Sequence, residues 1–285
     1  MNTLLDLLKF NREHASRHII KSNRRWWIAG LAAATVFVVS LVGARIASAT
    51  PSSTYWAPSV ATCQAKYVPH ITYDTYYGKG TPPPGLGAPT YPIDTGLTMG
   101  ILPWDKVQSE VGYDTLLPSS NPVFFLLNGK LCTTESSLFK GSPAIGGGIY
   151  NVGFKKKVTN YNILYVMAQK TLPFGGYVSA GLYHGTNDVL FTNSDGKIVK
   201  TGAILGAASP DINVGLKGLK KVLVVGDVQT GKNVFGAGGF GVELYFNDYI
   251  DLIVGPVFFI DKALQPGGKR TLWTTQLDVD IPLGR

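Results

Sequence analysis

Between residues 66 and 281, apolar and polar side chains alternate along the chain with a period of two. The stretch 239–259 shows this best, because one alternating run ends at Asn247–Asp248 and a second run follows directly. The apolar positions of the first run are Phe240, Val242, Leu244 and Phe246. Successive side chains of a β-strand point to opposite faces, so the stretch is predicted to be a hairpin with one apolar and one mixed face.

The last predicted strand, 271–281, separates apolar from polar side chains most clearly. Its apolar face carries Trp273, Leu277, Val279 and Ile281, and its polar face carries Thr274, Gln276, Asp278 and Asp280. The stretch 106–115 repeats this division and places Glu110 and Asp114 on its polar face. Unpaired carboxylates are costly in an apolar core. Such faces therefore favour a water-filled lumen or a solvent-facing surface over the core of a β-sandwich.

Twelve alternating stretches follow one another, and no convincing amphipathic helix occurs after residue 50. They are 66–76, 91–101, 106–115, 122–131, 144–154, 160–170, 174–184, 200–208, 219–230, 234–246, 249–260 and 271–281. Each is close to the roughly 9–11 residues that a tilted membrane strand needs. The sequence therefore predicts an all-β fold, a transmembrane antiparallel β-barrel of about 12 strands, within a range of roughly 10–14.

The first 49 residues differ from the remainder in composition. Residues 1–25 are polar and basic, Trp26–Ala44 is an unbroken apolar run, and Ala47–Ser48–Ala49 fits a cleavage site. We predict a signal peptide at 1–49, with an uncleaved membrane anchor as the alternative because the apolar run nearly spans a bilayer. These residues hold seven Lys/Arg and two Asp/Glu, against 19 and 16 in the remainder. The net charge of +8 therefore gives no reason to expect a nucleic-acid partner.

The remainder divides into a predicted periplasmic N-terminal segment, 50–65, and the barrel, 66–285. Cys63 precedes the first predicted strand and Cys132 follows the fourth, so both fall at the same end of the barrel. We predict a disulfide that ties the N-terminal segment to the second turn, since an exported compartment permits one. Two free cysteines are the alternative. No metal site is expected, because no His or carboxylate spacing surrounds these cysteines.

Two motifs suggest nucleotide binding, but their context does not support it. The run 221–233 ends in Gly231–Lys232, yet Asn233 replaces the Ser or Thr of a phosphate-binding loop and a strand follows in place of a helix. We interpret 230–233 as a hairpin loop. The glycines at 236, 238 and 241 lack the strand–turn–helix context of a dinucleotide site, and we expect them to clear space in a barrel.

A catalytic arrangement would need a nucleophile beside a histidine and a carboxylate. Ser179, His184 and Asp188 are close in sequence at a predicted strand end, but proximity alone supports them. We therefore expect no enzyme activity and no cofactor.

This pattern resembles that of small bacterial outer-membrane porins and porin-like transporters over residues 66–281. The predicted loops 78–90, 185–199 and 261–270 are long, whereas 102–105 and 247–248 are short turns, an asymmetry typical of such barrels. The resemblance implies localisation in the bacterial outer membrane, with membrane lipid and lipopolysaccharide as surroundings. The basic run Lys155–Lys157 in a predicted outer loop could contact lipopolysaccharide phosphates.

The predicted function is a porin-like channel for passive transport of small polar solutes. Six acidic side chains are expected to line the pore, which predicts a weak preference for cations: Glu110, Asp114, Asp227, Glu243, Asp278 and Asp280. One alternative is a non-conducting barrel that serves as anchor, adhesin or scaffold. The other is a soluble secreted β-sandwich or lipid-binding barrel, in which the apolar face of 239–246 would be core.

Overall fold

The computed structural model describes residues 53–78, 93–102, 104–117, 125–265 and 268–283. The strands all belong to one compact unit, Ile46–Pro282. The predicted signal peptide, 1–49, lies outside the described residues, as does most of the predicted loop 78–90. No helix in the described ranges is long and apolar enough to cross a membrane.

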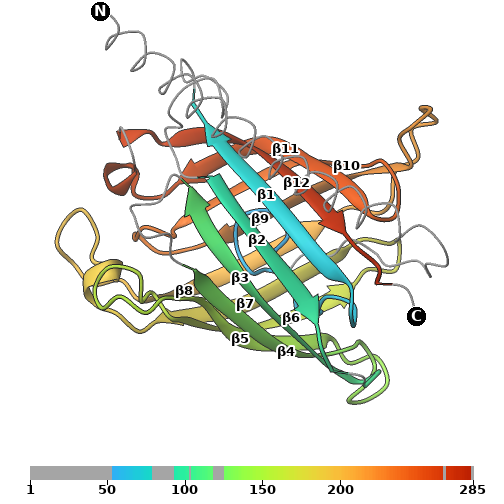
Figure 1. Ribbon diagram of the computed structural model, residues 1–285, viewed down its shortest axis with the longest axis horizontal. Helices are drawn as coiled ribbons and strands as arrows, with labels where there is room; N and C mark the ends of the chain where they lie inside the picture. Colours follow the sequence, from blue (N-terminus) through green and yellow to red (C-terminus); the bar gives the residue numbers. More distant parts are fainter. Residues whose placement is uncertain (1–52, 79–92, 103, 118–124, 266–267, 284–285) are drawn as a thin grey trace, which may run out of the picture. The chain divides into compact units, whose positions relative to one another are not determined.

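Twelve antiparallel strands form a closed barrel in which each strand pairs with its neighbours in sequence, and β1 pairs with β12 (Figure 1). The strands are β1 (Pro69–Tyr77), β2 (Ile93–Gly100), β3 (Val107–Leu117), β4 (Leu126–Thr133), β5 (Ala144–Val152), β6 (Ile163–Thr171), β7 (Tyr177–Gly185), β8 (Thr201–Ala208), β9 (Lys221–Gln229), β10 (Ala237–Tyr245), β11 (Ile250–Phe259) and β12 (Thr271–Asp280). Two short 3-10 helices, η1 (Val189–Phe191) and η2 (Lys262–Leu264), lie in the connections β7–β8 and β11–β12. The predicted fold class and all twelve strands are confirmed.

The outer face of the barrel is apolar. Phe240, Val242 and Phe246, from the hairpin that shows the alternation best, are 59%, 41% and 43% exposed. Equivalent exposed apolar side chains occur on β1, β3, β4 and β6 to β12: Ile71, Tyr73, Val111, Tyr113, Leu131, Leu164, Val166, Leu182, Leu205, Val224, Phe258, Trp273 and Leu277. The apolar face is therefore the outer surface of the barrel and not the core of a sandwich.

The inner face is polar and buried, and the chain itself occupies part of the lumen. Residues 53–68, here called the inner segment, contact β3, β4, β6, β9 and β12 through side chains that point into the barrel. In Figure 1 this segment is the blue loop within the ring of strands. The sequence placed 50–65 outside the barrel, in the periplasm. The structure instead places the described part of it inside, because buried polar groups of the wall bond its backbone.

Candidate functional site

One carboxylate of the barrel wall binds residues 55–59 of the inner segment. Asp227, on β9, accepts hydrogen bonds from the backbone N–H groups of Tyr55 (2.9 Å), Trp56 (2.8 Å) and Ala57 (3.1 Å). The Ser59 hydroxyl donates a fourth bond, at 2.8 Å. Successive N–H groups that converge on one anion form a backbone nest. Asp227 is only 6% exposed, so these bonds are what satisfies its carboxylate inside the protein.

The side chain of Tyr55 fills a slot made by inward-facing glycines of β10 and β11. An added Cβ at Gly239, Gly241 or Gly255 would come within 2.5 to 2.8 Å of the Tyr55 ring or hydroxyl. The Tyr55 hydroxyl donates to the carbonyl of Pro256 at 3.0 Å, and the Tyr55 carbonyl accepts a bond from the Gln276 amide at 2.8 Å. Of the three glycines that suggested a dinucleotide motif, Gly241 therefore makes room for the chain's own tyrosine, together with Gly239 and Gly255 outside that motif.

Residues 60–64 of the inner segment are bonded to β3, β4 and β6. The Ala61 N–H donates to the Gln169 side chain at 3.0 Å. Lys130 bonds the carbonyl of Val60 at 3.2 Å and pairs with Glu110 at 3.1 Å, so both charges are compensated in a buried place. Glu110 also accepts a bond from the N–H of Gln64 at 2.7 Å.

A disulfide joins Cys63 of the inner segment to Cys132. This is the pair that the sequence suggested, but Cys132 lies within β4 and not in the turn that follows it. Both side chains are buried, at 7% and 2% exposure. The covalent link therefore fixes the segment to the barrel wall.

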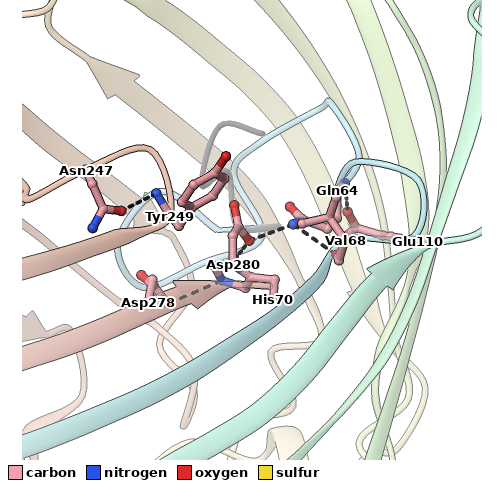
Figure 2. Close-up of polar contacts among 8 residues, drawn as sticks. All are labelled: Gln64, Val68, His70, Glu110, Asn247, Tyr249, Asp278 and Asp280. Carbon is pink, nitrogen blue, oxygen red and sulfur yellow. Dashed lines mark hydrogen bonds and ion pairs between the residues drawn. The ribbon is translucent and has the colours of Figure 1, made fainter. Parts of the chain in front are cut away.

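A cluster of polar side chains lies at the end of the barrel where β1 begins and β12 ends (Figure 2). This end is here called the terminal end of the barrel. The ring nitrogens of His70 contact Asp278 at 3.2 Å and Asp280 at 2.9 Å. Figure 2 shows Gln64 reaching from the inner segment toward this cluster, where its amide donates to Asp280 at 2.8 Å. The N–H of Asp280 also bonds the carbonyl of Tyr249, in the turn between β10 and β11. The cluster thus fastens the inner segment at its second end.

Beside the inner segment, the lumen keeps a cavity of about 430 Å³. Its carboxylates include Asp74, Asp94 and Asp114, which come from the neighbouring strands β1, β2 and β3. Asp74 and Asp94 are directly opposite in register, and Asp114 is opposite Gly96, two residues along β2. Its aromatic lining includes Trp56, Tyr76, Tyr150, Tyr161, Tyr165 and Phe235. None of the lining residues in the described ranges is Lys or Arg.

The six predicted pore-lining residues have different surroundings. Only Glu110 and Asp114 line the cavity. Asp227 is covered by the inner segment, and Asp278 and Asp280 contact His70. Glu243 is buried at 5% exposure on β10.

The sequence analysis missed Asp74 and Asp94, although both occur in predicted strands. Asp74 shares a face with Thr72 and Tyr76, and this alternation was a signal that could have identified it.

The structure does not assemble the other candidate motifs. Ser179 is buried inside the barrel, whereas His184 is exposed on the opposite face of β7, so they do not form a nucleophile–base pair. Residues 230–233 form part of the connection between β9 and β10, where Asn233 donates to the Tyr183 hydroxyl at 2.8 Å. In the part of the chain that the structure describes, no group of three His, Cys, Asp or Glu side chains is arranged to hold a metal ion.

These features define a closed twelve-stranded β-barrel whose lumen contains an N-terminal part of the same chain. A comparison with solved structures finds a likeness to the crystal structure of an outer membrane channel from Pseudomonas putida F1. The TM-score is 0.38 and the identity 12%, over 81% of this chain and 99% of that chain. A likeness at that score does not establish a shared fold or function, and the fold assignment rests on the strand pairing itself. No protein-family model and no curated protein matches the chain.

Proposed function

We propose that the protein is an outer-membrane barrel that conducts small polar solutes through a lumen narrowed by its inner segment. The observation that carries the membrane location is the inversion of polarity: exposed apolar side chains cover the outside, and buried polar ones line the inside. An apolar surface of this extent is unfavourable in water and favourable in lipid. A closed barrel also leaves no unpaired strand edge in the hydrocarbon.

The cavity beside the inner segment supports conduction. It extends from Leu264 and Gln265, in the β11–β12 connection, to His70 and Glu110 near the terminal end. A path of this kind is narrower than a twelve-stranded bore would be without the inner segment. Its carboxylates, without Lys or Arg among the described lining residues, favour cations over anions.

A second candidate is a non-conducting barrel that serves as anchor or scaffold. The observation in its favour is the number of independent fastenings of the inner segment, which include a disulfide, the nest around Asp227 and the bond from Gln64 to Asp280. A segment held so firmly can close a lumen permanently.

Planar-bilayer recording separates the two candidates. The protein is purified in detergent, and its folding is checked by heat-modifiable migration on a gel. Small discrete current steps that carry cations better than anions support the channel, whereas a folded barrel without conductance supports the scaffold. A protein that stays soluble without detergent would contradict the membrane location itself. The Cys63→Ser/Cys132→Ser double variant serves as comparison, because loosening the inner segment should enlarge the steps of a narrowed channel.

A further inference from the structure

Three carboxylates of the cavity lining form no ion pair in the described structure, whereas the lining residues His70 and Glu110 are already paired, His70 with Asp278 and Asp280 and Glu110 with Lys130. Asp74, Asp94 and Asp114 make no ion pair with any described residue, and one carboxylate oxygen of Asp94 is buried without a described hydrogen-bond partner. Neighbouring strands lie about 4.8 Å apart, so the three groups occur within roughly 10 Å along the wall. Like charges gathered in a cavity repel one another and are poorly hydrated. A bound cation relieves both costs.

The rest of the lining indicates what kind of cation fits. Trp56 belongs to the inner segment, Tyr150 to β5, and Tyr161 and Phe235 to connections between strands. Tyr161 and Phe235 pack edge to face at 4.9 Å between ring centres, and Tyr150 lies 6.5 Å from Phe235. Aromatic faces attract ammonium groups and also pack well on methylene chains. An inorganic ion would make little use of such a wall.

A separate polar group in the same cavity is available to a ligand. Gln229 is 1% exposed, and its amide oxygen accepts a bond from the Tyr150 hydroxyl at 2.7 Å. Its amide nitrogen is buried without a hydrogen-bond partner among the described residues. Buried polar groups of this kind are usually satisfied by water or ligand. The cavity volume of about 430 Å³ is within the range of small-molecule sites.

We propose that the cavity between the inner segment and β1–β5 binds a small organic cation with more than one amino group, of the diamine or polyamine class. The carboxylates of β1, β2 and β3 receive successive ammonium groups, which short methylene chains separate in such molecules. The aromatic side chains pack on these chains and face the ammonium groups. The interpretation of the bound cation as a transported solute rests on the proposed function. The binding itself does not, since it needs no conduction.

Isothermal titration calorimetry with spermidine tests the proposal on the detergent-purified protein. Saturable binding of one molecule per barrel is expected, with Asp94→Asn and Asp114→Asn each weakening it about tenfold. Asp211→Asn is the matched control, because Asp211 lies on the outside and pairs with Lys221 at 3.0 Å. Tyr161→Phe should retain affinity and Tyr161→Leu should lose it several-fold, which separates an aromatic wall from a merely acidic one.

Three outcomes would overturn the proposal: no saturable binding, equal binding by Asp94→Asn and the control, or full competition by Mg²⁺ at equal concentration. Heat-modifiable migration of each variant shows whether its barrel has folded. Because calorimetry does not depend on conduction, binding without conductance would reject the channel and keep the site. Conductance without binding would reject the site and keep the channel.

Discussion

The inner segment should detach from the wall when Asp227 is replaced. Its carboxylate accepts four hydrogen bonds, three of them from the backbone N–H groups of residues 55–57. Hydrogen bonds to a charged group contribute about 1.5–3 kcal/mol each, but groups that act together are not additive. The N–H groups of the released segment also form hydrogen bonds with water, which offsets part of the loss. We therefore expect Asp227→Ala to favour local opening by about 3–5 kcal/mol.

Asp227→Asn should have a smaller effect than Asp227→Ala. One oxygen of Asp227 accepts from Tyr55, Ala57 and Ser59, whereas the other accepts only from Trp56. An asparagine oriented with its oxygen toward the first three would keep those bonds and turn its amide group toward the N–H of Trp56. The expected cost is about half that of the alanine variant, because one donor is left facing another donor.

Hydrogen–deuterium exchange of peptides that cover 53–61 measures this opening. Since 1.4 kcal/mol is a factor of ten, an opening favoured by about 3 kcal/mol accelerates exchange roughly a hundredfold. Peptides from β6 and β7 should exchange as in the parent protein, and Asp211→Ala should leave the segment protected. Unchanged exchange at 53–61 in Asp227→Ala, or acceleration spread evenly over the barrel, would refute the idea of a separately fastened segment.

Three further predictions concern contacts that hold the inner segment and the turns. Gly206→Val should push the segment at Ser59 away from β8 and toward the barrel axis, since an added Cβ would meet the side chains of Ser179 and Ser59 at 2.7 and 2.8 Å, and limited proteolysis should then cleave near residue 59. Cys132→Ser should lower the temperature of the heat-modifiable gel transition, because a link between residues 69 apart stabilises by up to about 4 kcal/mol. Burial opposes ionisation of Glu135, but bonds from Lys170 and Thr171 outweigh it and hold the pKa of Glu135 below its ordinary value. Its stabilisation is thus present above that ordinary value and lost as the pH falls through the lowered one, so the melting difference between the parent and Glu135→Gln should shrink progressively as the pH falls below the ordinary pKa of glutamate.

The sequence predicts the barrel wall well because each strand carries its own local evidence. A period of two repeats over every strand, and the lipid-facing and inward-facing sets separate within a few residues, as Trp273 and Asp278 illustrate. Nothing distant has to be known to recognise such a pattern. The strand ends differ from the predicted ones by a few residues where a connection continues the alternation, as at 219–220 before β9.

The inner segment could not be predicted in this way, because its structure depends on distant residues. It has no regular secondary structure, and Tyr55 bonds a residue 172 positions away. Its Tyr–Trp pair and the glycines of β10 were visible in the sequence, but each has ordinary explanations alone. Only their contact in three dimensions shows that Tyr55 and the glycines at 239, 241 and 255 belong to one feature.

This difference changes the meaning of the acidic inner face. From the sequence, six carboxylates were equivalent contributors to a weak cation preference. In the structure, Asp227, Glu110 and Asp280 bond the inner segment, so most of their charge is directed at the protein itself. The carboxylates left to act on a solute are those of Asp74, Asp94 and Asp114, on three adjacent strands at one side of the lumen. In the proposed channel, selectivity should therefore arise from one wall of the lumen, whereas Asp227, Glu110 and Asp280 hold the inner segment that narrows it.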